Sequence, residues 1–191
     1  MLRPVAHRDH IRGPIHAPYA LVEYGDYECA RCGEACQIIK EVQGQMDGDL
    51  CFAFRNFPIA FAHPRAERAA EAGEAAAAQG FFWEMHDALF ENQDALEDGD
   101  LVFRALRIGM DARRLAQELQ NGSHTVRVRE DFWSGVRIGI ENLPALFVNG
   151  VRFEGTLDED VLLAALLGRP YCDVGSLALG RNHSVGKDVL A

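Results

Sequence analysis

The sequence lacks the features that mark membrane-spanning or exported chains. No apolar run approaches the ~20 residues that a transmembrane helix needs, and the N-terminal segment carries charges and prolines where a secretory signal has an apolar core. It also lacks internal repeats and low-complexity linkers. These absences predict a cytoplasmic protein without a membrane partner.

Basic residues are scarce as well. The 191 residues include 19 lysines and arginines against 29 aspartates and glutamates, which gives a formal net charge of −10. Nucleic-acid binding needs a basic face that replaces counterions, so this charge argues against nucleic acid as a partner. The composition, with 48% hydrophobic and 25% charged residues, is that of a globular protein long enough to bury a full core.

Cysteines are few, odd in number and clustered. Three of the five, Cys29, Cys32 and Cys36, fall within eight positions, which is not typical of a disulfide scaffold. In the cytoplasm a close pair of cysteines is more often catalytic or metal-binding than structural. Cys36 is expected to be a small buried residue, with a third redox thiol as the alternative. Cys51 is expected in the core and Cys172 in a tail.

Hydrophobic patterning predicts a sheet interrupted by helices. Strands are expected at 19–24 and 50–57, with a helix over 29–46 that ends at Gly44 and Gly48. The Asn149-Gly150 pair between two apolar runs predicts a hairpin over 145–154. The other expected helices lie at 65–79, 81–92, 101–108, 112–119, 123–138 and 158–167. Ser123 is expected to cap the helix that follows it, and Thr156 or Asp158 the last helix, whereas residues 1–18 are expected to be irregular.

The order of these elements predicts a split α/β core with an all-helical insertion. The strands before residue 60 and after residue 140 can form one sheet only if the two segments join. We expect the core to comprise residues 1–62 and 140–191, of which 171–191 form a loose tail, and the helical insertion to comprise 63–139.

The motif Cys29-Ala30-Arg31-Cys32 lies where a buried strand leads into a helix. The unpaired N–H groups and the positive dipole end of a helix N-terminus favour a thiolate at Cys29, and Arg31 adds a cation. The thiolate is the nucleophile of disulfide exchange. Cys29 is therefore expected to attack, and Cys32, one turn further on, to resolve the mixed disulfide.

Zinc binding is the alternative for this motif. Cys36 and Cys51 could supply further ligands, but a second closely spaced ligand pair is absent. The redox interpretation is favoured, and it requires neither a metal ion nor another cofactor.

Two other residues have informative surroundings. Glu23 lies in the first buried strand, where a carboxylate is costly without a partner or a task. It could accept the proton of Cys32 if it points beneath the helix, or it could face the other way and be solvated. Pro144 precedes a strand, either as an ordinary edge residue or as a cis-proline.

No catalytic role is assigned to His63 or His86. The aromatic residues near 81–90 are expected in the core, and some could border an apolar substrate groove near Cys29.

Five segments occur together in a familiar order: Ala17-Pro18, 21–32, Arg55 to Pro58 with His63-Pro64, 82–90 and 143–150. With them the chain resembles the DsbA-like thiol oxidoreductases of the thioredoxin superfamily. The resemblance implies a thioredoxin fold with an inserted helical domain. It implies Cys29 as the nucleophile, Cys32 as the resolving thiol, Glu23 as a buried acid and a cis Pro144 opposite the pair. The backbone before that proline would bind an extended substrate segment.

Three positions depart from the family pattern: Ala30 replaces a frequent proline, Arg31 a frequent histidine, and Leu143 a small or β-branched residue. All three residues are expected to contact substrate. The two residues between the cysteines, Ala30 and Arg31, influence the reduction potential and therefore the direction of the reaction. The function implied is thiol–disulfide exchange on protein or small-molecule disulfides, with a further redox protein as partner. The alternatives are a thioredoxin-fold redox-sensing or chaperone module, with or without a bound metal, and a glutathione-using transferase or isomerase.

Overall fold

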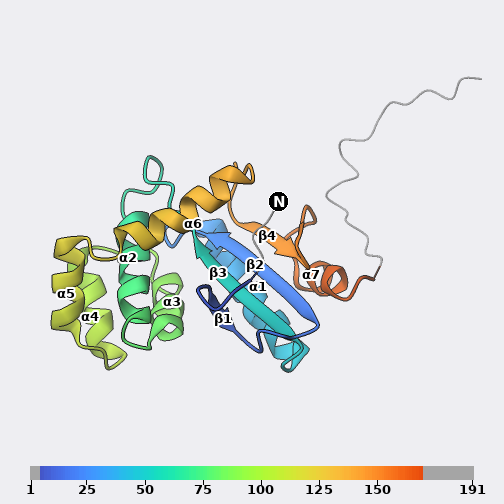
Figure 1. Ribbon diagram of the computed structural model, residues 1–191, viewed down its shortest axis with the longest axis horizontal. Coiled ribbons are helices and arrows are strands. Elements are labelled where there is room, and N and C mark those ends of the chain that lie inside the picture. Colours follow the sequence, from blue (N-terminus) through green and yellow to red (C-terminus); the bar gives the residue numbers. More distant parts are fainter. Residues whose placement is uncertain (1–4, 170–191) are drawn as a thin grey trace, which may run out of the picture.

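The computed structural model describes residues 5–169, and the predicted tail at 171–191 lies outside them. Five strands form one mixed sheet in the order β1-β3-β2-β4-β5 (Figure 1). Their bounds are His10–Arg12 (β1), Tyr19–Gly25 (β2), Leu50–Asn56 (β3), Ala145–Val148 (β4) and Val151–Arg152 (β5). Strands β2 and β3 are parallel, while the other pairs are antiparallel. The sheet thus joins the two halves of the chain, as the sequence predicts.

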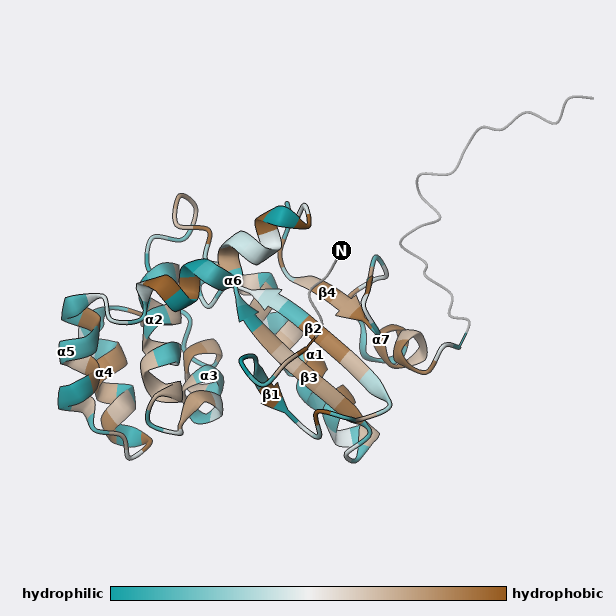
Figure 2. Cartoon of the chain, in the orientation of Figure 1, coloured by the Kyte–Doolittle hydropathy of each residue, from teal (hydrophilic) through white to brown (hydrophobic). Residues whose placement is uncertain are grey.

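The strands β2 and β3 are connected by the helix α1, Ala30–Met46. Both strands read as apolar runs because they are covered on both faces: every residue of β3 is buried, as are the last five of β2. Figure 2 shows hydrophobic residues concentrated on these two strands. This β2-α1-β3 unit places the start of α1, and with it Cys29, at the carboxyl end of a buried strand.

Between β3 and β4 the chain forms five helices, which Figure 1 shows beside the sheet with α6 crossing toward it. They are α2 (Ala66–Ala77), α3 (Phe82–Phe90), α4 (Asp98–Arg107), α5 (Ala112–Asn121) and α6 (Thr125–Arg137). The last helix, α7 (Glu159–Leu166), packs against α1. The α/β thioredoxin fold with a helical insertion is therefore confirmed, while the exact domain boundaries stay a prediction. None of the helices described between residues 5 and 169 has the length and apolar character needed to cross a membrane.

Local details differ from the sequence prediction in three places and agree with it in a fourth. Helix α1 continues through Gly44 and ends at Asp47, which adopts a left-handed conformation. The N-cap position of α6 is His124 rather than Ser123, and the His124 side chain makes no capping hydrogen bond. The second hairpin strand has only two residues, although the Asn149-Gly150 turn has the expected positive φ angles of 49° and 85°. Asp158 caps α7 as predicted, because its carboxylate accepts hydrogen bonds from the first helical N–H groups.

The strand β1 was not expected, because three residues of mixed polarity give no strand periodicity. Its side chains attach the helical insertion to the sheet. His10 Nε2 lies 2.9 Å from Glu74 of α2, and Arg12 donates to Asp87 of α3 at 2.9 Å. The N-terminal segment therefore links the two parts of the molecule.

Candidate active site

Cys29 is the N-cap residue of α1, with extended backbone angles and a half-buried side chain. A hydrogen bond from the Cys32 thiol lowers the pKa of Cys29 from 9.0 to about 6, and the N–H groups of Cys32 and Arg31 contribute in the same direction. Burial and the charge of Asp26 oppose this shift. The helix N-terminus thus holds a thiol that is largely ionised at neutral pH, which is the reactive form of cysteine.

Cys32 is fully buried one helical turn later, with 0% of its surface exposed. Its hydrogen bond to Cys29 raises the pKa of Cys32 far above 9.0, and burial and the nearby Glu23 raise it further. The two thiols therefore differ strongly in acidity and accessibility. A partly exposed, acidic thiol beside a buried, protonated one is the arrangement that an attacking and a resolving cysteine require.

Glu23 lies in the middle of β2, between Phe54 of β3 and Leu146 of β4. Its side chain is completely buried, and neither carboxylate oxygen has a hydrogen-bond partner among the described residues. Burial raises the pKa of Glu23 from 4.5 to about 8, and the charge of Cys29 adds to the increase. The solvated orientation is excluded. Glu23 faces the cysteine helix, because it raises the pKa values of both Cys32 and Cys36.

The Leu143–Pro144 peptide bond is cis, as the resemblance implies. Pro144 lines a small cavity of about 60 Å³ together with Arg31, so this proline lies against the start of α1. Leu143, which precedes the proline, is buried, with 8% of its surface exposed. Strand β5 pairs with Phe147 and Val148, and the N–H of Phe153 donates to the carbonyl of Leu146 at 2.9 Å. Within residues 5–169 the outer edge of β4 therefore lacks a strand partner at its first residue, Ala145.

Two polar residues that sequence reasoning left out lie beside the cysteine motif. His63 Nδ1 is 2.8 Å from the buried carboxylate of Asp26, three residues before Cys29. Gln93, from the segment after α3, donates hydrogen bonds of 2.9 Å to the carbonyl oxygens of Tyr27 and Cys29. His63 belongs to a segment of the family pattern, whereas nothing in the sequence marks Gln93, because only the tertiary fold brings it to α1.

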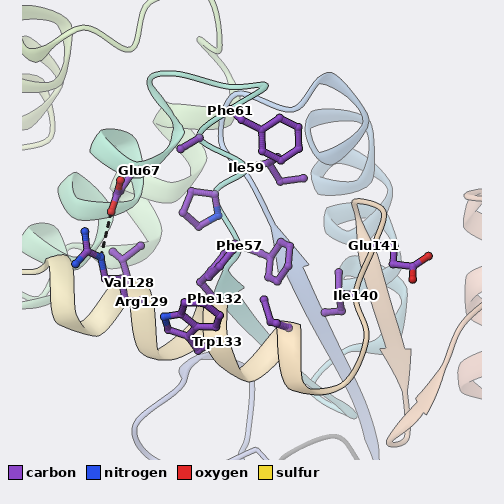
Figure 3. Close-up of a pocket in the computed structure, with 13 residues that line it drawn as sticks. Phe57, Ile59, Phe61, Glu67, Val128, Arg129, Phe132, Trp133, Ile140 and Glu141 are labelled. Carbon is purple, nitrogen blue, oxygen red and sulfur yellow. Dashed lines mark ion pairs between the residues drawn. The ribbon is translucent and has the colours of Figure 1, made fainter.

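An apolar groove runs between the β3–α2 loop and α6, with a volume of about 440 Å³. Figure 3 shows Ile59 and Phe61 on one side and Phe132 and Trp133 on the other. The ring of Phe57 stacks on Phe132, with 4.7 Å between the centroids. Phe61 at its rim is 95% exposed. The predicted groove therefore exists in another place: Phe82 and Phe90 are buried in the core, as first expected of them, and do not border it.

Hydrogen bonds from the backbone of the groove residues connect the groove to the turn before the cysteine motif. The N–H of Ile59 donates to Asp26 at 2.8 Å, and Phe57 N–H donates to Gly25 at 2.8 Å. At the other end, Ile140 and Glu141 line the groove just before the cis-proline.

The remaining cysteines have different surroundings. Cys36 forms a close group with His86 and Asp87, whose possible ligand atoms lie within 4.8 Å of one another. The group is poorly suited to a cation: burial raises the pKa of Cys36 to about 12, and Arg12 and Lys40 already pair with Asp87. Cys51 is buried in β3, and Cys172 lies outside the described residues.

Comparison with known proteins agrees with this geometry. Residues 6–167 match the family model described as Thioredoxin. BdbD from Bacillus subtilis in its oxidised form has a TM-score of 0.78 and 25% identity, covering 87% of this chain and 95% of that one. The thiol-disulfide exchange protein alpha-DsbA2 from Wolbachia pipientis has a TM-score of 0.74 and 19% identity, covering 85% and 87%. The chain belongs to the thioredoxin family, and its fold is that of the DsbA-like thiol–disulfide oxidoreductases.

A closer match in sequence comes from a longer protein. The "Na(+)/H(+) antiporter NhaA 1" of Mycolicibacterium vanbaalenii is 44% identical over 169 residues, which are 87% of this chain but 27% of that protein. The chain thus spans about a quarter of the length of the curated relatives that it matches.

Proposed function

We propose that this protein is a thiol–disulfide oxidoreductase that works through Cys29 and Cys32. The observation that carries the proposal is the contrast between the two thiols: Cys29 is accessible with a pKa lowered to about 6, and Cys32 beside it is buried. Such a pair can exchange between dithiol and disulfide without a bound cofactor. The cis-proline and the open edge of β4 provide a place for a substrate next to it.

In the oxidising direction, a substrate thiolate attacks the sulfur of Cys29 in the enzyme disulfide. The Cys29–Cys32 bond breaks, and Cys32 takes a proton, which Glu23 can supply because its pKa of about 8 keeps it protonated at neutral pH. A second substrate thiolate then attacks the substrate sulfur of the mixed disulfide, and Cys29 leaves as a thiolate. The substrate loses two electrons, and the enzyme ends as a dithiol.

The low pKa of Cys29 favours this direction, because a stabilised thiolate is a good leaving group and stabilises the reduced enzyme. The direction is tested by equilibrating the protein with glutathione. We expect a reduction potential less negative than about −270 mV, the value of thioredoxin. A value at or below that of thioredoxin would assign the reducing direction instead.

The exchange reaction itself is tested by trapping. A Cys32→Ser variant should accumulate mixed disulfides between Cys29 and a disulfide-containing peptide: the Cys29 thiolate attacks the peptide disulfide, one peptide thiolate leaves, and the resolving thiol is missing. Cys36→Ser serves as the matched control, since it removes a buried thiol of the same helix and should leave exchange intact. Trapping by the double variant C29S/C32S, or normal turnover by Cys29→Ser, would contradict the assigned roles.

Extended polypeptides are the substrate class that the surface supports. The open edge of β4 can pair with a backbone, and the adjoining groove can accept an apolar side chain. Phe61→Ser should raise KM for a reduced unfolded protein severalfold and leave turnover of a small dithiol unchanged. Phe103→Ser on α4, which removes another exposed phenylalanine, is the control. Equal effects of the two variants would remove the groove from the proposal.

The alternatives predict different results. A redox sensor or chaperone would bind unfolded protein equally well with Cys29→Ser, and a glutathione transferase would not need Cys32. Sodium–proton exchange is the named activity of the longer relatives, and thiol exchange is the activity that this chain's cysteine pair can perform. The redox partner stays unidentified, and the cytoplasmic location stays a prediction that fractionation of the native host would test.

A further inference from the structure

The buried carboxylate of Asp26 is the organising group of the turn before Cys29. Its side chain has no exposed surface. One oxygen accepts the N–H of Glu28 at 2.8 Å, and the other accepts the N–H of Ile59 at 2.8 Å and faces His63. The carbonyl of the same residue accepts the N–H of Cys29 at 3.2 Å. A fixed negative charge is therefore held one turn from the nucleophile.

That charge works against the chemistry of Cys29. A nearby anion disfavours a second anion, and Asp26 indeed raises the pKa of Cys29 in opposition to the hydrogen bonds that lower it. The carboxylate would be an obstacle to thiolate formation if nothing compensated it.

His63 can provide the compensation. Partial burial lowers its pKa, but the hydrogen bond and charge of Asp26 outweigh this effect and raise it above 6.5. Cys29 and Glu28 add to the increase. Because such coupling is reciprocal, an imidazolium that is stabilised by the Cys29 thiolate stabilises that thiolate in return. The side chain is 25% exposed, so it can exchange its proton with solvent.

We propose that His63 is a positioning residue for the nucleophile: its imidazolium, held by Asp26, offsets the buried negative charge and keeps Cys29 in the thiolate form. The inference rests on the proposed function, since it concerns the attacking thiol. It replaces the earlier expectation that His63 has no part in the reaction.

The other charged groups around His63 support a local pair. Glu28 lies in the same turn, but Arg65 pairs with it at 3.2 Å and donates its backbone N–H to it. Glu23 faces Cys29 from the strand below and is protonated near neutral pH. Between pH 6 and the raised pKa of His63, thiolate and imidazolium are therefore both present. Above that interval the imidazole is neutral, and the charge of Asp26 is no longer offset.

The test is the pH profile of alkylation of Cys29 by iodoacetamide in the reduced protein, followed by peptide mass. His63→Gln keeps a hydrogen-bond donor to Asp26 but removes the charge. We expect its profile to move to higher pH by about one unit. His63→Lys restores a cation and should move the profile back toward that of the unmodified protein. If glutamine disturbs the fold, His63→Asn makes the same neutral replacement.

His124→Gln is the matched control, because His124 forms a similar pair with Glu118 at 3.0 Å in the helical insertion. Its Cys29 profile should be unchanged. An unshifted profile in His63→Gln, or an equal shift in His63→Lys, would overturn the proposal. Alkylation needs no disulfide substrate, so this result is separate from the trapping experiment, and a protein that never exchanged disulfides could still show the shift.

Discussion

Two buried acidic residues of this protein have opposite surroundings. Asp9 pairs with Arg55 through two hydrogen bonds of 2.9 and 3.0 Å, and Arg55 Nη1 also donates to Tyr24 at 3.0 Å. Glu23, in the neighbouring strand, has no hydrogen-bond partner among the described residues. The paired acid links the N-terminal segment to the sheet. The unpaired acid lies beneath the cysteines, and the proton transfer proposed for it would explain its cost to stability.

Breaking the paired group should have the largest effect. Asp9→Ala leaves the guanidinium of Arg55 fully buried without its carboxylate, and we expect a loss of about 3–5 kcal/mol of unfolding free energy. Urea unfolding measures this loss. The Cys29 alkylation rate of the folded variant should stay unchanged.

Asp98→Ala is the matched control for that variant. Asp98 receives two hydrogen bonds from Arg68 with nearly the same geometry, 2.8 and 2.9 Å, but its side chain is 61% exposed. Its loss should cost less than about 1 kcal/mol, because water solvates the separated charges. If Asp9→Ala and Asp98→Ala lost similar amounts of unfolding free energy, burial would not determine how strongly an ion pair stabilises this protein.

Removing the unpaired acid should stabilise the reduced protein at high pH. The folded-state pKa of Glu23 is raised to about 8, so the contribution of this residue to stability is greatest below about pH 4.5 and falls as pH rises from there through 8. Glutamine cannot ionise, so Glu23→Gln should not show this fall in unfolding free energy with pH. The fall that it avoids is on the order of a few kcal/mol. Thermal melts of the reduced proteins between pH 5 and 9 measure it. A parallel decline in both proteins would contradict the buried, unpaired state of Glu23.

The same variant should be slower in exchange. Glutamine can neither donate nor accept the proton of Cys32, and we expect resolution of the mixed disulfide to slow by about tenfold or more. Stopped-flow measurement with a peptide disulfide separates this step from the attack by Cys29. A stabilised variant with unchanged resolution would remove Glu23 from the mechanism.

Among the changes at the cysteine site, the smallest effect is expected at Gln93, a polar link with neutral partners. Gln93→Ala removes two hydrogen bonds to the carbonyls of Tyr27 and Cys29, at a cost of about 1–2 kcal/mol. It should also lower the protection of the α1 N-terminus in hydrogen exchange. Gln79→Ala, which removes a similar link to the backbone of Asp111 far from the cysteines, is the control. Equal protection of α1 in the two variants would contradict a local role.

Most of the fold follows from local pattern. The strands β2 and β3 are apolar runs, the Asn149-Gly150 turn has few alternatives, and the helices of the insertion have a clear period. The pattern missed β1 because its three residues are held by Arg12 and His10 contacts with distant helices. It also misplaced the apolar groove, whose walls come from a loop and from α6.

The sequence by itself determined the split α/β core, the cysteine motif at the start of α1 and the buried position of Glu23's strand, because each depends on neighbours in the chain. Only the tertiary structure decided that Glu23 has no hydrogen-bond partner among residues 5–169, that Asp26 meets His63, and that Gln93 reaches Cys29. These three depend on contacts across 37 to 64 positions or on the packing of three strands. Acidity at a site is set by burial and by charges in space, which a linear sequence does not contain.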